Sequence, residues 1–513
     1  MPRHKFLGLM NKTVFLLLLS LLAIRDGLGQ MQEREFRAVW IATVKNIDWP
    51  SRADLSVEQQ QQDLISMLDG LKVQGFNAII FQIRPGGDAF YESSYEPWSQ
   101  WLTGTEGKAP TPFYDPLSFL TQACHERGME LHAWFNPFRT SLDWDSSKVH
   151  ASTHLTQTHP DWLVQYGKNL YLDPGIPAAR NYVRTVIMDV VDRYEIDAVH
   201  FDDYFYPYRI DTLDFPDTIS FRAFGQDFDQ VEDWRRNNVN QFVQDLHDQL
   251  QVHRPYVQLG ISPFGVWRNK DRDSKGSDSR AGQTSYDDLF ADVRHWLAEG
   301  WIDYVAPQVY FSIGYPPAAF EKLLDWWSQN SFGRNVYIGH AAYKIANNHD
   351  KNWENPDQIP AQIRLLRQYH QIHGSAFFSA KWLPQNPLGV SDSLQNHYYK
   401  QMALPPRLPW LDKRAPLPPV NVWSKARKGG IQLRWDNSLS SSDIKFHIVY
   451  RASGRTVPQA TEKFFYTIIW GNPGQWLDQD TPRFRKHSYL ITAVDRAHNE
   501  SEANQLLVRR RWW

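Results

Sequence analysis

The feature that most constrains the fold is an alternation, repeated eight times between Phe36 and Met402, of short apolar runs and helix-length segments. In those longer segments apolar residues recur with a period near 3.6, which is typical of helices that bury one face. Strands that alternate with helices indicate a parallel sheet, because parallel neighbours need long crossover connections. The runs that we expect as strands are 36–43, 78–84, 130–136, 198–202, 258–262, 304–310, 336–339 and 375–379.

The helices expected between these strands cover 58–74, 116–127, 177–194, 235–253, 287–299, 318–329, 360–373 and 391–402. Glycines at helix ends support several of these boundaries, namely Gly75, Gly128, Gly300 and Gly374. Eight strand–helix units in about 370 residues predict an α/β fold, a (β/α)8 TIM barrel with long loops. A doubly wound open sheet is the alternative, and it is disfavoured because no glycine-rich phosphate loop follows the first run.

The chain changes character after the last of these units. Six prolines fall between Leu404 and Pro419, and they predict an extended and stiff connector. Short strand-like runs separated by turn residues then follow at 430–435, 446–452, 464–470 and 488–494, which predicts a small all-β sandwich. We therefore expect a leader at 1–29, a barrel at 30–403, a proline-rich linker at 404–419 and a β-sandwich at 420–513.

The first residues have the pattern of a signal peptide. Basic residues precede an apolar run at 14–24, which is short for a membrane span but typical of a signal-peptide core, and small residues follow at 27–29. The single cysteine, Cys124, allows no intrachain disulfide, and its amphipathic surroundings predict a small core residue. The sequence therefore predicts an exported protein that is periplasmic or extracellular.

Composition narrows the classes of partner. The 55 Lys and Arg against 57 Asp and Glu give a formal charge of −2, which argues against a dedicated nucleic-acid binder. Beyond the leader, no run has the 18 apolar residues of a membrane span. Aromatic residues make up 14% of the chain, and flat rings suit stacking on a polysaccharide. Because Walker, HExxH and CxxC motifs are missing, we expect no cofactor and no metal. Nothing in the sequence indicates an oligomeric state.

Strand parity locates the candidate site. Alternate residues of a barrel strand face the lumen, and active sites of such barrels form at the carboxyl ends of the strands. The parity that carries polar residues holds Gln82, Arg84, His132, Asn136, His200, Asp202, Gln308 and Tyr310. We expect these side chains, together with that of Tyr204, to bind and orient a sugar, although a satisfied core network is an alternative for the two deeper histidines. The tryptophans expected to stack on sugar are Trp40, Trp49, Trp98, Trp134, Trp267 and Trp382.

The densest polar feature is the run from His200 to Pro207, which contains Asp202 and Asp203. Adjacent carboxylates disfavour simultaneous ionisation, so one can keep a proton while the other stays charged. Glycosidic cleavage needs such a pair, an acid for the leaving oxygen and an anion for the oxocarbenium-like centre. We expect Asp202 to be catalytic, with Asp203 or Asp88 as its partner; Glu92, Asp48 and Asp278 are further sources of a second carboxylate.

Several stretches, in the right order, resemble the barrels of the glycosyl-hydrolase-like family ten. They include RAVWIATV at 37–44, QIRP at 82–85, HAWFNP at 132–137, HFDDYFYP at 200–207 and WIDYVAPQVY at 301–310. The resemblance covers about 35–383 and implies an exported bacterial glycosidase. At least one member of the family cleaves peptidoglycan glycan strands that carry no peptides, which implies this class of substrate.

The fourth expected strand also resembles, more distantly, that of chitinase-type barrels. Tyr204 stands where those barrels place their acid catalyst. A mechanism assisted by the acetamido group of the sugar therefore stays open as an alternative, but this resemblance does not imply it. Residues 489–501 resemble the penultimate strand and turn of fibronectin type III domains. Two other functions stay open: a barrel that binds a glycan without cutting it, and an envelope scaffold that uses the β-sandwich for protein contacts.

Overall fold

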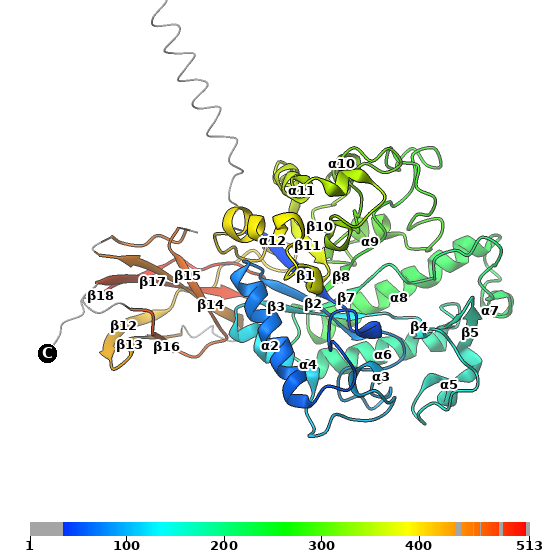
Figure 1. Cartoon of the computed structure of the whole chain (residues 1–513), viewed down its shortest axis with the longest axis horizontal. Helices are drawn as coiled ribbons and strands as arrows, with labels where there is room; N and C mark the ends of the chain where they lie inside the picture. The colour runs from blue at the N-terminus through cyan, green and yellow to red at the C-terminus, as the bar shows by residue number, and fades with distance from the viewer. Residues whose placement is uncertain (1–33, 438–442, 455, 462, 482–485, 509–513) are drawn as a thin grey trace, which may run out of the picture.

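The computed structural model describes residues 34–437, 443–454, 456–461, 463–481 and 486–508. The predicted leader at 1–29 lies outside the described residues. Within them, a large α/β barrel is followed by a small β module, which lies at one end of the barrel (Figure 1). No described helix combines the length and the apolar character that a membrane span requires.

Eight parallel strands close the barrel in the order β1, β2, β3, β7, β8, β9, β10, β11 and back to β1. Their bounds are β1 Phe36–Ile41, β2 Ala78–Arg84, β3 Glu130–Phe135, β7 Ala198–Phe201, β8 Gln258–Ile261, β9 Tyr304–Val305, β10 Asn335–Ala341 and β11 Ile372–Phe378. Pairing between β1 and β11 completes the closure, so the TIM-barrel prediction is confirmed and the open sheet is excluded.

Helices surround the barrel: α2 Val57–Val73, α4 Pro116–Glu126, α6 Pro177–Arg193, α8 Val231–His253, α9 Val293–Glu299, α10 Phe320–Gln329, α11 Gln358–Leu366 and α12 Val390–Ser393, the last continued by a π-helical turn Leu394–Tyr398. Outward-facing strand residues such as Ile79 and Phe81 pack against this layer. The lumen alternates large and small residues, with Phe36, Tyr304 and Tyr337 beside several alanines. The core therefore has two parts, one on each face of the strands.

The predicted helix over 360–373 is wrong in its second half. The helix α11 ends at Leu366, and β11 already begins at Ile372. Gly374 consequently lies inside a strand and does not end a helix. Its φ is +149°, and a Cβ there would meet the backbone oxygen of Phe36 at 2.1 Å, so this position where β1 and β11 join requires glycine.

The loops after the strands carry elements that the sequence pattern did not predict. The strands β4 Arg139–Ser141, β5 Leu163–Tyr166 and β6 Asn169–Leu172 form a small antiparallel sheet in the order β4, β6, β5. The short helices α3 Gln100–Thr103, α5 Leu155–Thr158 and α7 Thr218–Phe224 accompany it. These additions lie at the end of the barrel opposite the β module (Figure 1). They build walls around the carboxyl ends of the strands.

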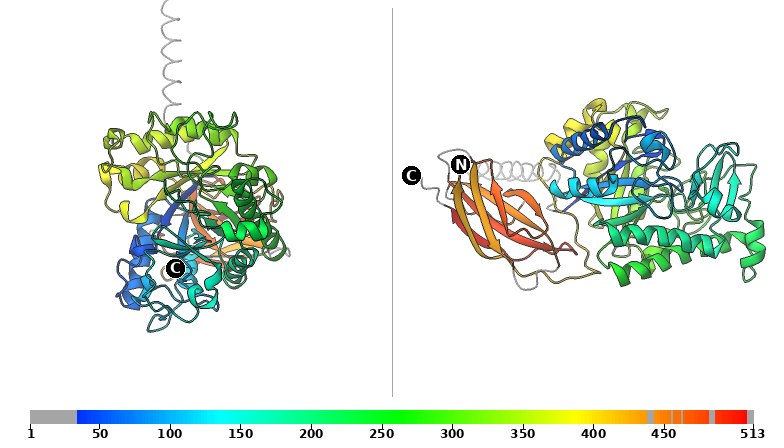
Figure 2. Two further views of the ribbon diagram at one scale, coloured as in Figure 1. Left: turned by 90° about the vertical axis from the view of Figure 1, so that its right-hand side faces the viewer. Right: turned by 90° about the horizontal axis from the view of Figure 1, so that it is seen from below.

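The C-terminal module consists of two antiparallel sheets, as the sequence predicts for an all-β unit. One sheet has the order β12, β13, β16 (Val420–Arg427, Gly430–Asp436, Gln475–Asp478). The other has the order β15, β14, β17, β18 (Phe465–Trp470, Ile444–Ser453, His487–Asp495, Asn504–Val508). All four predicted strands are present, whereas β12, β16 and β18 escaped prediction. Figure 2 shows the module as a distinct body beside the barrel.

A buried ion cluster joins the module to the amino-terminal end of the barrel. Lys445 of β14 places its Nζ 2.5 Å from Oε1 of Glu130 and 2.9 Å from Oδ1 of Asp197. The Nε2 atom of His498 lies 2.8 Å from the same Glu130 oxygen. Glu130 begins β3 and Asp197 precedes β7, so both carboxylates lie at the amino-terminal end of the barrel. The module supplies the positive charge that pairs with them. The Lys445 side chain is only 9% exposed.

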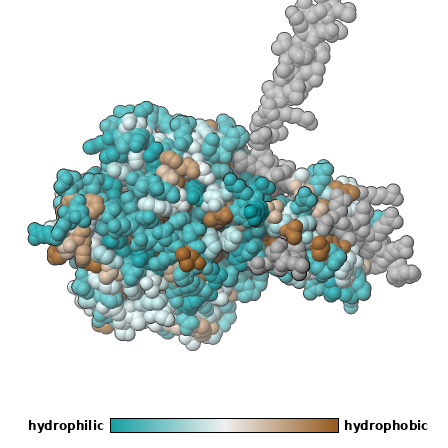
Figure 3. All heavy atoms as spheres, turned by 180° about the vertical axis from the view of Figure 1, so that it is seen from behind, coloured by the Kyte–Doolittle hydropathy of each residue, from teal (hydrophilic) through white to brown (hydrophobic). Residues whose placement is uncertain are grey.

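The face of the molecule drawn in Figure 3 is mainly polar. Figure 3 shows one face of the molecule, on which hydrophilic residues predominate and apolar residues gather only in small separate groups. The predicted core position of Cys124 is confirmed, since this residue is fully buried in α4. Aromatic and charged side chains converge instead in a cleft at the carboxyl ends of the barrel strands.

Candidate active site

A cleft of about 500 Å³ opens at the carboxyl ends of the barrel strands. Its lining residues come from all eight strands or from the segments that follow them, as expected for a TIM barrel. They are Trp40, Ala42, Val44, Ile47, Gln82, Trp134, Arg139, Asp202, Asp203, Tyr204, Tyr208, Ser262, Phe264, Gln308, Tyr310, Phe311, Tyr343, Lys344 and Phe378. The predicted residues Asp202, Asp203, Gln82, Tyr204, Gln308, Tyr310 and Trp40 are thus brought together.

Asp202 is held by several donors. The Asn136 amide and the Trp134 indole, the latter at 3.2 Å, donate to its Oδ2, and the backbone N–H of Tyr204 donates to Oδ1 at 3.2 Å. Burial raises the pKa of Asp202, while the positive charge of Arg139 and these three donors oppose the rise. The surroundings therefore favour Asp202 as the charged member of the pair.

Asp203 has different surroundings. It is 2% exposed, and its Oδ2 accepts a hydrogen bond from the hydroxyl of Tyr208. Within the described part of the chain its Oδ1 has no hydrogen-bond partner. Burial and the adjacent negative charge of Asp202 raise the pKa of Asp203 to about 7, although Tyr208 and Gln308 partly oppose the rise. Asp203 can therefore hold a proton near neutral pH.

The two carboxyl groups can share one cleft because β7 ends just before Asp202. The last residue of β7 is Phe201, so strand alternation no longer separates Asp202 from Asp203. An anion and a proton donor with a raised pKa in one cleft form the pair of groups that acetal cleavage requires. The arrangement can thus protonate a leaving oxygen and stabilise positive charge at the neighbouring carbon.

The polar residues around the pair are fixed by their own hydrogen bonds. Gln82 accepts from the backbone N–H groups of Thr43 and Val44, both at 3.0 Å, and donates to Asn136 Oδ1 at 2.7 Å. Arg139 donates from Nε to the Pro85 carbonyl at 2.7 Å. Such locked side chains hold the acid pair in one geometry, which is the condition for efficient catalysis.

Aromatic rings form most of the remaining wall: Trp40, Trp134, Tyr204, Tyr208, Phe264, Tyr310, Phe311, Tyr343 and Phe378. Rings with an apolar face and a polar edge match the alternating CH and OH groups of a pyranose. Arg139 lies over the ring of Tyr204, with its guanidinium carbon 5.4 Å from the ring centroid. The cleft therefore has the surface expected of a carbohydrate site.

His132 and His200 do not reach the cleft, which corrects their prediction as substrate-binding residues. Both are fully buried in the lumen, and each places its Nδ1 against the hydroxyl of Tyr304, at 2.7 and 2.8 Å. The Tyr304 ring fits there because Gly260 has no Cβ; one would lie 1.9 Å from the ring. The histidines belong to a deeper layer of lumen side chains, so the alternative of a satisfied core network is correct.

Arg84 is also misplaced by the parity argument, because β2 contains a bulge. Gln82 pairs with Trp134 but Arg84 pairs with Phe135, so the alternation slips by one residue. Arg84 is fully buried and forms a bidentate ion pair with Glu96, at 2.5 and 2.7 Å. Asn136 is likewise fully buried, and it acts on Asp202 instead of on a ligand. These two residues support the site without lining it.

Four of the six predicted tryptophans and the alternative carboxylates lie outside the cleft, whereas Trp40 and Trp134 line it. Trp49 and Trp267 are buried and donate to the Gln60 carbonyl at 3.0 Å and to Asp292 Oδ1 at 3.1 Å, while Trp98 and Trp382 are half-buried. Asp88 lines a separate cavity of about 30 Å³, where burial raises its pKa to about 7. The remaining candidates do not line the cleft either: Asp48 accepts structural hydrogen bonds, and Glu92 and Asp278 are exposed. Asp203 is therefore the carboxylate in position to partner Asp202.

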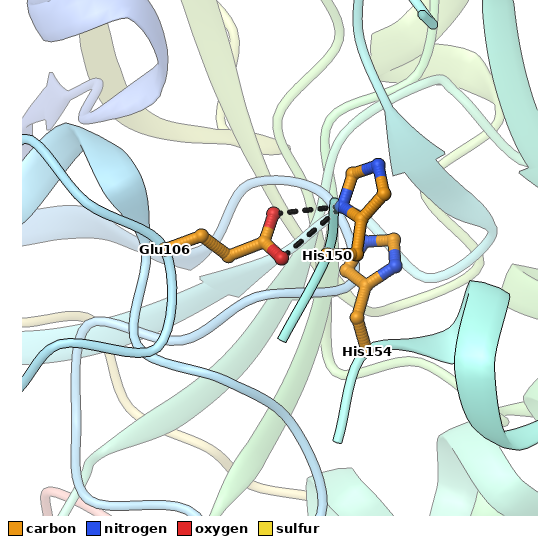
Figure 4. Close-up of side chains that lie close together, drawn as sticks. All are labelled: Glu106, His150 and His154. Carbon is orange, nitrogen blue, oxygen red and sulfur yellow. Dashed lines mark hydrogen bonds and ion pairs between the residues drawn. The ribbon is translucent and has the colours of Figure 1, made fainter. Parts of the chain in front are cut away.

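A cluster of Glu106, His150 and His154 adjoins the small cavity (Figure 4). One potential ligand atom from each residue lies within 4.8 Å of the others. The two imidazole rings are stacked, with centroids 4.2 Å apart and planes only 18° from parallel, so one ion cannot lie in both ring planes. His150 instead contacts both Glu106 oxygens at 3.0 and 3.1 Å, and the cluster anchors the loop before α5.

Several cleft residues escaped the sequence argument because they lie in the connections after the barrel strands, where the strand alternation no longer indicates orientation. Among them are Arg139, Tyr208, Phe264, Phe311, Tyr343 and Lys344. Tyr208 had the clearest available signal, since it follows the acid pair by only a few residues. The β4–β6–β5 sheet, which positions Arg139, has no counterpart in the strand pattern.

The barrel with an acidic, aromatic cleft at its carboxyl end defines the class of carbohydrate-active TIM barrels. The sequence profile of the glycosyl hydrolase-like 10 family matches residues 35–355, and the chain belongs to this family. It is 46% identical over 481 residues to the glycosyl hydrolase YngK of Bacillus subtilis strain 168, covering 92% of this chain and 93% of that protein. It is 35% identical over 386 residues to the glycosyl hydrolase DigH of Escherichia coli strain K12, covering 71% and 87%.

Among solved structures, the glycoside hydrolase domain of PgaB (BpsB) from Bordetella bronchiseptica is similar with a TM-score of 0.44 and 13% identity, over 71% of this chain and 99% of that domain. The catalytic domain of β-amylase from Paenibacillus polymyxa has a TM-score of 0.43 and 11% identity, over 72% and 99%. Family membership supports a glycosidase function for this chain.

Proposed function

We propose that this protein is an exported glycoside hydrolase that cleaves O-glycosyl bonds of a polysaccharide, with peptide-free glycan strands of peptidoglycan as its substrate. The observation that carries the proposal is the pair Asp202 and Asp203, which share one aromatic cleft but differ in their surroundings. The family resemblance supports the substrate class, since at least one member cleaves such strands.

In the proposed reaction Asp203 is the general acid. Its carboxyl proton passes to the glycosidic oxygen as the bond between that oxygen and the anomeric carbon breaks. The Asp202 carboxylate stabilises the positive charge that develops at this carbon. A water molecule then adds its hydroxyl to the anomeric carbon, and its remaining proton returns to the Asp203 carboxylate, which restores the enzyme.

Product analysis tests this function against the non-catalytic alternative. Purified protein is incubated with peptide-free peptidoglycan strands and with a panel of neutral polysaccharides, and the reducing ends and fragments are identified by mass spectrometry. We expect fragments from the peptide-free strands, no turnover by Asp202→Asn, and binding of the strands by this variant. If the unmodified protein binds glycans but cleaves none of them, the protein is a carbohydrate-binding barrel.

The proposal includes export and a fibronectin type III-like C-terminal module. The leader pattern at 1–29 supports export, and the two antiparallel sheets of three and four strands support the module assignment. N-terminal sequencing of the mature protein after fractionation of cells tests the first part. An intact leader on protein that stays in the cytoplasm would contradict it.

A further inference from the structure

Lys344 places a spare positive charge in the wall of the cleft. It ends the 3-10 helix Ala342–Lys344, which follows β10, and its Nζ donates a hydrogen bond to the Tyr310 carbonyl at 2.7 Å. The ammonium group forms no ion pair with a carboxylate of the described residues. The other cation of the cleft, Arg139, is held by hydrogen bonds to Pro85 and Asn136, and its charge already acts on Asp202, where it opposes the rise in pKa caused by burial.

The surroundings of Lys344 make an unpaired charge costly. The side chain is half-buried, which removes part of the ammonium group from water. The rings of Phe311 and Tyr343, with centroids 5.7 and 5.8 Å from Nζ, favour a cation at this place but supply no counter-ion. Burial lowers the pKa of Lys344, and the charge of Asp350 opposes this only at a distance. A charge removed from water without a counter-ion is unfavourable unless a ligand supplies the opposite charge.

We propose that Lys344 binds a carboxylate carried by the glycan, so that the cleft selects acidic sugars over neutral ones with the same backbone. This inference rests on the proposed function. In peptide-free peptidoglycan the carboxylate belongs to the lactyl ether of N-acetylmuramic acid, whereas in intact peptidoglycan an amide bond to the peptide removes its charge. The same chemistry is offered by a uronic acid, and the substrates of the test separate these two sources.

The test compares the ratio of kcat/KM values for acidic and neutral substrates. The substrates are peptide-free strands, the same strands after conversion of the lactyl carboxyls to methyl amides, chitooligosaccharides and a polyuronate. We expect Lys344→Met to lower the preference for acidic over amidated strands about 10- to 100-fold, mainly through KM. Lys344→Arg keeps most of the preference. Lys351→Met, which removes an exposed lysine paired with Glu354, is the matched control.

Each outcome decides the inference. Equal losses on acidic and amidated strands would show that Lys344 only ties its loop to Tyr310, and this overturns the proposal. Equal cleavage of both strands by the unmodified protein overturns it as well. Preference for the polyuronate assigns the carboxylate to a uronic acid. If no glycan is cleaved, the proposed function fails. Calorimetric binding of the same oligosaccharides then tests Lys344 on its own. Equal affinity for acidic and amidated oligosaccharides would overturn the proposed role of Lys344.

Discussion

Asp202 and Asp203 are neighbours in the chain, yet different groups contact their carboxyl oxygens. Asp202 receives hydrogen bonds from Asn136, Trp134 and a backbone N–H, whereas Asp203 receives one from Tyr208. The residue with more donors is better suited to carry charge, and the other to carry a proton. The different protonation of the two carboxyl groups therefore arises from the residues that contact them, since both groups belong to the same type of side chain.

Replacement of Asp203 by Asn removes the proposed proton donor with little change in shape. We expect kcat to fall about 10²- to 10⁴-fold, the usual contribution of general acid catalysis. Binding of the glycan, measured by calorimetry, should persist. Asp278→Asn, at an exposed aspartate outside the cleft, is the control. Full activity of the Asp203 variant would assign the acid to another group.

The pH profile follows from the pKa of Asp203, which burial and the Asp202 charge raise to about 7. Activity needs the protonated form, so kcat/KM should decline as pH rises above about 7. Tyr208→Phe removes a donor that favours the Asp203 anion, so the decline should move to higher pH.

The stability of the fold should change in the same pH range, because a carboxyl pKa raised by folding lowers the free energy of unfolding as pH rises from about 4 to about 7. Asp203→Asn should therefore unfold at a higher temperature than the unmodified protein at pH 8, and an equal or lower temperature would contradict this.

At the scale of elements, the sequence pattern predicted most of the barrel because eight buried strands and their amphipathic helices repeat one periodicity. Parity correctly directed Gln82 and Asp202 to the cleft. It failed at Arg84, where a bulge in β2 shifts the alternation, and a bulge leaves no sign in a single sequence. Parity also does not give the position of a residue along the barrel axis. It assigned His132 correctly to the lumen, but it could not separate the buried layer that contains His132 from the open cleft.

Closure of the barrel between β1 and β11 depends on Gly374. A methyl group there would meet backbone atoms of Phe36, and the φ of +149° disfavours any side chain. We expect Gly374→Ala to lower the free energy of unfolding by about 3 kcal/mol or more, since backbone cannot move aside. Gly70→Ala, in the interior of α2 with open space around it, is the matched control and should stabilise the protein by about 0.5–1 kcal/mol. Similar denaturation midpoints for both variants would contradict this account.

At the scale of the whole molecule, barrel and module form one unit because they share buried charges. Removal of one partner from a buried ion cluster leaves uncompensated charge, which typically costs about 3–5 kcal/mol. We expect Lys445→Met to cause a loss of this size, seen as a lower midpoint of a single unfolding transition. Lys425→Met, at an exposed lysine of β12, should change little. Two separate transitions in the unmodified protein would show that the module and the barrel unfold independently.

The same cluster affects how the scaffold alternative can be tested. Deletion of the residues after 404 would remove Lys445, which pairs with Glu130 and Asp197 at the amino-terminal end of the barrel. Loss of function after such a deletion would therefore not distinguish a change in the barrel from the loss of a protein contact made by the module. Substitutions on exposed module residues, such as Trp423, are the informative ones, since its indole is 42% exposed.

The position of Lys445 also has a consequence for biosynthesis. The chain is made from its N-terminus, so every barrel strand exists before the lysine that neutralises the base of the barrel. Until that residue is added, Glu130 and Asp197 lack their main counter-ion, and burying them is unfavourable. Charge pairing at the amino-terminal end of the barrel is therefore completed only when the last fifth of the chain has been made.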